Sequence, residues 1–269
     1  MSEKEAIKKS VREGYAQIAL QGSSCCGGSD LATEIGRKIG YGDEELAAVP
    51  EGANLGLGCG NPLALAALQG GETVVDLGSG AGFDCFLASR LVGAAGRVIG
   101  VDMTPAMLDK ARENARKGGF GNVEFRLGEI EHLPVADNTA DLIISNCVIN
   151  LSPDKEQVFH DAYRVLKPGG RLMISDIVLL KELPDAIRSS IEAYIGCIAG
   201  AALKDHYLGA LAAAGFQDIR IMEETTFPLD LIISDPTLKA VAENLQLDHE
   251  EAEKLARTVV SMKVAARKT

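Results

Sequence analysis

Short apolar runs alternate with helix-like segments through the middle of the chain. The runs are rich in β-branched and apolar residues, and they are TVVDL at 73–77, RVIGVD at 97–102, NVEFRLG at 122–128, DLIISN at 141–146 and RLMISDIV at 171–178. Between two of them, residues 105–117 begin with a proline and carry apolar side chains at helical spacing, which is typical of a helix that covers a sheet. This alternation predicts βαβ units around a mostly parallel sheet buried on both faces, an α/β doubly wound fold.

The segments on either side of this core differ from it in composition and in hydrophobic pattern. The first part is helical and loop-like, with glycine-rich runs that hold cysteine, and the stretch after the last core strand is mostly helical by pattern. The final part combines β-branched runs, which predict strands at the sheet edge, with a helix-like segment at 235–245. We therefore divide the chain into an N-terminal cap at 1–70, a core at 71–178, an inserted substrate cap at 179–215 and a C-terminal region at 216–269.

The charge balance excludes several classes of partner. The 269 residues include 27 basic and 38 acidic side chains, a net charge of −11, and 46% are apolar. Such a chain repels phosphate backbones and anionic lipid headgroups, so nucleic acid and membrane surfaces are poor partners. It has no apolar run near the ~20 residues that span a bilayer, and its first residues lack the apolar core of a signal peptide. We expect a soluble, cytoplasmic protein.

A glycine-rich turn, GSGAG, follows the strand at 73–77 and precedes a helix. Glycines such as Gly78 and Gly80 let backbone N–H groups approach a ligand at the helix N-terminus. The dinucleotide motif G-x-G-x-x-G would need glycine where Phe83 stands, so that motif fails. Asp76, just before the turn, would repel a pyrophosphate but attract a ligand with an ammonium and a sulfonium group. This combination indicates S-adenosylmethionine.

Asp102 ends the strand at 97–102, where a carboxylate can accept hydrogen bonds from ribose hydroxyls. Met103 follows it and could pack on the adenine. Asp102 could instead cap the helix that begins near Thr104 and Pro105. Its place after the glycine-rich turn favours the role in cofactor binding.

Three segments, VVDLGSGAG, GVDMTPAML and RVLKPGGRLMISD, resemble the class I S-adenosylmethionine-dependent methyltransferases in this order. The resemblance covers about residues 71–178 and implies a seven-stranded sheet of the Rossmann-like type. Beside Asp76, Gly78, Gly80, Asp102 and Met103, which are argued above, the cofactor contacts that it implies are Ser79, Glu129, Ile130 and Asn146. Such a fold does not by itself choose the methyl acceptor.

Six cysteines are spread along the chain, and none has the C-x-x-C spacing of a zinc or redox site. We expect them to start as thiols in a reducing compartment. Cys147 follows the strand at 141–146, at the sheet edge where open α/β folds bind ligands. Cys59 and Cys197 lie in small-residue segments that would let their sulfur atoms converge there. Cys85, one turn into a helix, is expected in the core.

Three converging thiolates without a histidine or carboxylate partner favour a soft acceptor with a trigonal preference. Zinc prefers four ligands in a tetrahedron, whereas trivalent arsenic binds three sulfurs in a pyramid and keeps a lone pair. Because that lone pair is itself a nucleophile, methyl transfer to it needs no general base. The sequence therefore predicts arsenite, bound as a thiol adduct, as the acceptor.

Further segments carry a more specific resemblance. GANLGLGCGNP, DLGSGAGFDCFLA, VEFRLGEIEHLPV, IISNCVINLSPDK and AYIGCIAGA are similar to signatures of the arsenite methyltransferases, over most of residues 41–216. The resemblance implies that Cys147 and Cys197 are core arsenic ligands and that Cys59 is the third sulfur or a resolving thiol.

The vicinal pair Cys25 and Cys26 is a separate case, because a disulfide between adjacent residues strains the backbone. The family resemblance implies that one of the two acts with Cys59 in reduction, and the sequence does not choose between them. Methylation formally oxidises trivalent arsenic to the pentavalent state, so a dithiol must supply two electrons and become a disulfide. Thioredoxin or glutathione would then restore the thiols.

Two other functions remain alternatives. A methyltransferase for a carbon or oxygen atom of a small metabolite would need a base near the donor, and the four histidines offer no obvious one. A metalloid-binding sensor would keep the fold without turnover, although the intact donor signature argues against it. Nicotinamide oxidoreduction is disfavoured by Phe83.

Overall fold

The structure is a computed structural model, and it describes residues 2–21, 28–188, 190–226 and 257–269. Cys25, Cys26 and the helix predicted at 235–245 lie outside the described residues. None of the described helices is both long and apolar enough to cross a membrane.

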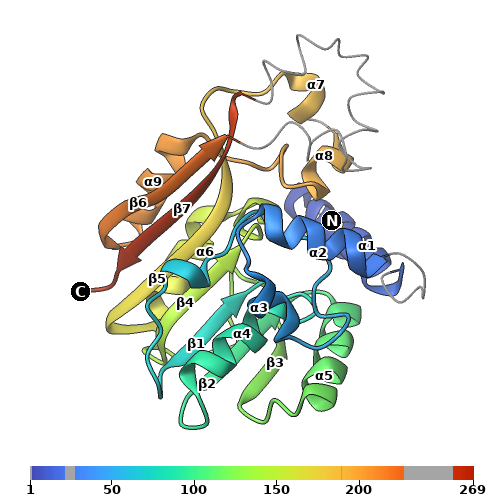
Figure 1. The fold of residues 1–269 in the computed structure, drawn as a ribbon. Helices are drawn as coiled ribbons and strands as arrows, with labels where there is room; N and C mark the ends of the chain where they lie inside the picture. Colours follow the sequence, from blue (N-terminus) through green and yellow to red (C-terminus); the bar gives the residue numbers. More distant parts are fainter. Residues whose placement is uncertain (1, 22–27, 189, 227–256) are drawn as a thin grey trace.

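A seven-stranded sheet forms the centre of the molecule, in the order β3-β2-β1-β4-β5-β7-β6 (Figure 1). Its strands are β1 (Thr73–Leu77), β2 (Arg97–Asp102), β3 (Val123–Leu127), β4 (Ala140–Asn146), β5 (Leu166–Leu179), β6 (Gln217–Thr226) and β7 (Val259–Arg267). The first five strands are parallel, and β7 runs antiparallel to β5 and β6. The predicted doubly wound fold is confirmed. Its strand order reverses between β1 and β4, which is where such sheets bind ligands.

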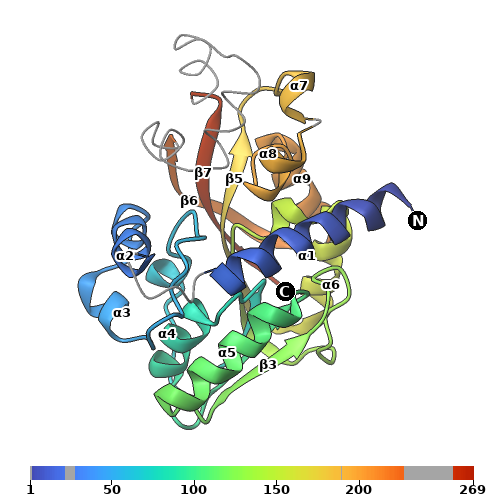
Figure 2. The ribbon, with the colours of Figure 1, turned by 90° about the vertical axis from the view of Figure 1, so that its right-hand side faces the viewer.

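Helices cover both faces of the sheet and its carboxyl edge (Figures 1 and 2). They are α1 (Glu3–Gln21), α2 (Gly28–Lys38), α3 (Asp43–Ala47), η1 (Leu63–Leu65), α4 (Phe83–Val92), α5 (Pro105–Gly118), η2 (Ile149–Leu151), α6 (Lys155–Val165), α7 (Asp185–Arg188), α8 (Ile191–Ile195) and α9 (Lys204–Ala213). Helices α4 and α5 pack on one face of the sheet, and α6 and α9 pack on the other.

The two core layers follow from the two-residue period of the strands. Val74 of β1 packs in the same cluster as Phe86 of α4, whereas its neighbour Val75 packs in the cluster that contains Phe159 of α6. Because both faces of β1 are covered, its last four residues are all buried, which is why apolar and polar residues do not alternate along this strand.

A third apolar cluster lies under the cap segments at the carboxyl edge of the sheet. It joins Val11 of α1 to Ile187 of α7, and all three cysteines of the predicted substrate site belong to it. Helix α1 crosses this edge and packs against α5 and α8 (Figure 2). The cap segments therefore exclude water from the place where the ligand-binding edge of the sheet meets the cysteines.

Candidate active site

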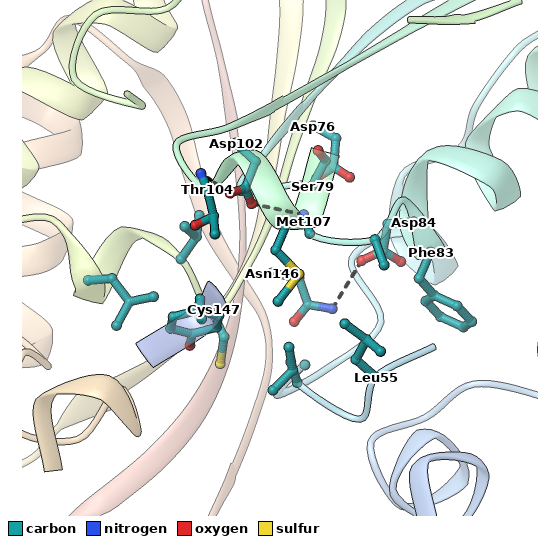
Figure 3. A pocket seen from close by; sticks show the side chains of 18 of the residues that line it. Leu55, Asp76, Ser79, Phe83, Asp84, Asp102, Thr104, Met107, Asn146 and Cys147 are labelled. Carbon is teal, nitrogen blue, oxygen red and sulfur yellow. Dashed lines mark hydrogen bonds between the residues drawn. The ribbon is translucent and has the colours of Figure 1, made fainter. Parts of the chain in front are cut away.

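A deep pocket opens at the carboxyl ends of β1, β2 and β4 (Figure 3). Its volume is about 1120 Å³ when the open mouth is included, which suits a ligand of cofactor size. The sheet contributes Asp76, Asp102 and Asn146 to its wall, and the cap contributes Tyr15 of α1 and Leu55. The pocket thus lies between the core and the cap.

The glycine-rich turn forms one wall of the pocket, and its geometry requires glycine. Gly78 has φ +67°, and a Cβ there would come within 2.3 Å of the Val148 side chain. Gly80 has φ +52°, and a Cβ there would have no heavy atom within 4 Å, so its backbone is open to a ligand. Between them, the Oγ of Ser79 is buried without a hydrogen-bond partner among the described residues. The turn therefore leaves open space beside the α-carbon of Gly80 and holds a Ser79 hydroxyl that is unpaired among the described residues.

Asp102 does not cap α5, whose N-cap residue is Thr104, but it shapes both the segment before that helix and the glycine-rich turn. Its Oδ1 accepts a hydrogen bond from the backbone N–H of Thr104 at 2.8 Å, at the start of α5. Its Oδ2 accepts one from the N–H of Gly80 at 3.0 Å. Met103 and Ile130 line the same pocket, as predicted for residues near an adenine. These two residues can therefore contact a ligand in the pocket.

Glu129, predicted to contact adenosine, does not line this pocket. Its carboxylate pairs instead with Lys8 of α1 at 2.8 Å and lies 3.8 Å from Arg12. Lys8 does line the pocket and also pairs with Glu131 at 3.1 Å. These pairs could not be predicted from the sequence, because they join α1 to a loop more than a hundred residues away.

Three carboxylates give the pocket its electrostatic character. Burial raises the pKa of Asp76 well above its usual value, and the nearby charge of Asp84 raises it further. Burial also raises the pKa of Asp84 to about 6 and that of Asp102 above its ordinary value. Within the described residues, no basic side chain forms an ion pair with any of the three. A cationic ligand would therefore relieve the cost of burying these groups.

Asn146 connects this pocket to the cysteine loop. Its Nδ2 donates to Asp84 Oδ2 at 3.1 Å and to the carbonyl of Gly60 at 2.8 Å, and its Oδ1 accepts from the N–H of Cys59 at 3.1 Å. Tyr41 completes the network, since its hydroxyl donates to Asp84 Oδ1 at 2.6 Å. One amide at the end of β4 thus fixes both a pocket carboxylate and the backbone on both sides of the Cys59 side chain.

The structure joins Cys59 and Cys147 in a disulfide, with their Cα atoms 5.8 Å apart. The expectation that all six cysteines start as thiols is corrected here, because folding brings these two within bridging distance. Cys147 also lines the pocket (Figure 3). The Cys197 thiol donates to the carbonyl oxygen of Cys147 at 3.0 Å. The three cysteines predicted to converge thus lie in one cluster, and their chemical roles stay predictions.

Two glycines explain how separate segments reach this spot. A Cβ at Gly60 would lie 1.9 Å from the Ser175 hydroxyl of β5, and a Cβ at Gly200 would lie 2.2 Å from the carbonyl oxygen of Asn150. Both distances are shorter than any real contact, so the loops of Cys59 and Cys197 can dock only with glycine at these positions.

Asp176 of β5 lies beside the disulfide, with a carboxylate oxygen within 4.8 Å of the sulfur atoms of both Cys59 and Cys147. The expectation that the thiols have no carboxylate partner is therefore wrong. Burial raises the pKa of Asp176 to about 7, and Tyr207 and Asn150 donate hydrogen bonds to it at 3.0 and 2.8 Å. The acidic residue was visible in the strand at 171–178, but its neighbours are set by tertiary packing.

Comparison with known proteins decides the family. The methyltransferase domain family matches residues 68–215, more than half of the chain. An arsenic (III) S-adenosylmethionine methyltransferase from Chlamydomonas reinhardtii has a solved structure that is 34% identical, with a TM-score of 0.64, over 87% of this chain and 73% of that one. The chain belongs to the arsenite methyltransferase family.

Curated relatives support the same family, but the match covers only part of one relative's length, and methyltransferases for other acceptors also match. An arsenite methyltransferase of Halobacterium salinarum is 51% identical over 84% of this chain, but the match spans only 62% of that protein's length. A ubiquinone/menaquinone biosynthesis C-methyltransferase of an Enterobacter species is 33% identical over 71% of this chain and 72% of its own length. Membership in the arsenite methyltransferase family thus rests on a core that is shared with methyltransferases for other acceptors.

Asp84 also lines the pocket and was not predicted as a site residue, although it closely follows the glycine-rich turn in the sequence. Asp84 lies in the first turn of α4, two residues after Gly82, which begins that helix with φ +95°. A carboxylate in the first turn is stabilised by the unpaired N–H groups of the helix. Its position just after a ligand-binding glycine turn would have marked it as a pocket residue.

Proposed function

We propose that this chain transfers a methyl group from S-adenosylmethionine to trivalent arsenic bound by its cysteines. The observation that carries the proposal is the position of Cys147, which lines the cofactor pocket and lies in one cluster with Cys59 and Cys197. Cofactor and acceptor sites are therefore contiguous at the end of β4. A chain with an isolated cofactor pocket would not support this function.

S-adenosylmethionine fits the pocket by charge and by shape. When bound, it supplies an electrophilic methyl group on a sulfonium centre. The cation would lie among the buried carboxylates Asp76 and Asp84, whose pKa values burial already raises. Ser79, Gly80 and Asp102 are among the further polar residues that line this pocket.

Arsenite would load onto thiols, so the Cys59–Cys147 disulfide must first be reduced. Three thiols then replace three hydroxyl groups on arsenic and release three water molecules. Cys147, Cys197 and Cys59 are the proposed ligands, since their sulfur chemistry suits a soft pyramidal centre. The cap over the third apolar cluster excludes water, and a water-poor site favours a step that disperses the sulfonium charge.

The lone pair of thiol-bound arsenic accepts the methyl group, and arsenic passes formally from the trivalent to the pentavalent state. Two thiolates then leave as a disulfide and return two electrons to arsenic. The Cys59–Cys147 disulfide supports this part of the proposal, because it is an oxidised dithiol at the pocket wall. Cys25 or Cys26 would relay the oxidation from Cys59, and thioredoxin or glutathione in the cytoplasm would reset the thiols.

The direct experiment is incubation of the full chain with methyl-labelled S-adenosylmethionine, arsenite and a thiol reductant. Labelled methylarsenicals are the expected products. Arsenite binding without transfer of label would support a sensor instead and overturn the proposal. Transfer of label that does not respond to arsenite would support a small-metabolite methyltransferase, which is the alternative that the shared C-methyltransferase core favours.

A further inference from the structure

Cys59, Cys147 and Asp176 bring three ligand atoms together, all within 4.8 Å of one another. Their exposed fractions are 5%, 6% and 0%. They come from a cap loop, the end of β4 and β5, so the tertiary fold assembles the group. We propose that the reduced chain binds a thiophilic divalent cation, Zn²⁺ or Cd²⁺, through these three residues.

The donor set selects this class of cation. Two soft thiolates and one carboxylate oxygen suit zinc or cadmium, whereas magnesium and calcium require oxygen ligands throughout. In a tetrahedral zinc site, bond lengths of about 2.0–2.3 Å place ligand atoms roughly 3.3–3.8 Å apart. The Asp176 oxygen lies within 4.8 Å of both sulfurs, and reduction of the disulfide lets the two bonded sulfurs separate toward the spacing of a metal site.

The balance of the binding step is simple. An external dithiol reduces the Cys59–Cys147 bond and is itself oxidised, leaving two thiols on the chain. The cation then displaces the two thiol protons, and any proton on Asp176, to solvent, so that Asp176 binds as the carboxylate. The three anionic ligands exceed the charge of the cation by one. Lys155 can offset that charge, although burial lowers the pKa of its ammonium and the nearby charge of Asp176 only partly opposes this shift.

The surroundings of Asp176 hold it in a fixed orientation. The Tyr207 hydroxyl donates to its Oδ2, and Asn150 Nδ2 and the Ile177 N–H donate to its Oδ1. Such outer hydrogen bonds orient a metal ligand and strengthen its binding.

This cation site shares two ligands with the proposed arsenic site and differs in the third. Arsenic would take the sulfur of Cys197, whereas the cation takes the oxygen of Asp176. Cation binding needs neither arsenite nor S-adenosylmethionine, so it can succeed or fail independently of the proposed function. A bound cation would hold Cys59 and Cys147 apart and thereby block both disulfide formation and arsenite loading.

The test uses the reduced full chain with Cys25→Ser and Cys26→Ser, which removes the vicinal thiols as a competing site. Cd²⁺ alone is added without oxygen, and binding is followed by the thiolate-to-cadmium charge-transfer absorbance in competition with a chelator. We expect one cation per chain. Asp176→Asn should weaken the affinity at least ~10-fold, as should Cys59→Ser, because each removes a group that holds the metal.

Cys85→Ser is the matched control, since Cys85 is a buried thiol that packs in a different apolar cluster from Cys59 and Cys147 and should leave the affinity unchanged. Unchanged affinity in Asp176→Asn would overturn the proposal. If that variant does not fold, X-ray absorption at the cadmium edge decides with Asp176 in place. Two sulfurs plus oxygen around cadmium are expected, and a shell of three or more sulfurs would contradict the site.

Discussion

Cys147 and Cys197 both have left-handed backbone conformations, with φ angles of +59° and +64°. A residue with a Cβ pays about 1–2 kcal/mol for this conformation, so a fold keeps it only where the surroundings impose it. Both residues are proposed ligands of the same arsenic atom. The strained backbone conformation at each residue is consistent with a fold that sets the direction of the cysteine side chain.

The strain at Cys197 gives a stability prediction. Cys197→Gly should be more stable than Cys197→Ala by about 1 kcal/mol, because both lose the thiol but only glycine is relaxed at φ +64°. Urea unfolding under reducing conditions measures the difference. The same exchange at Gly209, a helical position with open space around it, is the control, since alanine should be the more stable residue there. An alanine advantage at both positions would refute the argument from strain.

The buried carboxylate of Asp84 predicts how stability depends on pH. Its pKa is about 6 in the folded chain and about 3.9 in an unfolded one, so the folded state binds the proton more tightly. The free energy of unfolding should therefore fall as pH rises from about 4 to about 6. Asp84→Asn should remove part of this fall, as measured by denaturant unfolding across that range.

The control for this titration is Asp109→Asn, which changes an exposed carboxylate of α5. It should keep the pH dependence of the unaltered chain. If the free energy of unfolding of Asp84→Asn falls with pH as much as that of the unaltered chain, another group causes the pH dependence. Asp76 is the first candidate, because its pKa is also raised.

At the scale of single residues, the sequence located residues that line the pocket where the fold has a positional rule, and their roles stay predictions. Asp76, Asp102 and Cys147 were predictable because each stands near the carboxyl end of a strand, the edge where these sheets bind ligands. Asp176 was not predicted as a partner of the thiols. Its neighbours come from a loop and from the end of β4, and no spacing in the sequence encodes those contacts.

At the scale of elements, the docking of the Cys59 loop on β5 depends on one glycine. Gly60→Ala should slow formation of the Cys59–Cys147 disulfide and destabilise the chain by about 1–3 kcal/mol, because its Cβ would overlap the Ser175 hydroxyl. Thiol quantification during oxidation and denaturant unfolding measure the two effects.

Adding Ser175→Gly to Gly60→Ala removes the overlapping hydroxyl and should restore the rate of disulfide formation. This second change separates a local clash from a general loss of folding. If the double variant oxidises as slowly as Gly60→Ala alone, contact with Ser175 is not what limits the loop.

The core elements followed from the sequence more closely than the cap did. All five predicted core strands appear, although β5 begins at Leu166, several residues before the apolar run that marked it. The segment at 179–215 was predicted as mostly helical, and the structure divides it into α7, α8 and α9, with only four and five residues in the first two. Gly196 and Gly200 interrupt the helical pattern there, and the division into cap and core stays a prediction.

At the scale of the whole molecule, the order of the strands follows the family resemblance, whereas the placement of α1 does not. An amphipathic pattern shows that α1 has an apolar face but not which surface receives it. The structure packs α1 against α5 and α8 (Figure 2). Lys8 and Tyr15 of α1 consequently line the pocket. The site is consequently assembled from both ends of the chain, since Ser261 of β7 also donates to the carbonyl of Cys59.

The most direct measurement is single-turnover transfer of labelled methyl groups from S-adenosylmethionine to arsenite by Cys147→Ser and Cys197→Ser, with Cys85→Ser as the control. We expect both site variants to lose transfer while they bind S-adenosylmethionine almost as tightly as the unaltered chain, and we expect Cys85→Ser to stay active. Full methylation of arsenite by both site variants would contradict the claim that these sulfur atoms hold the acceptor.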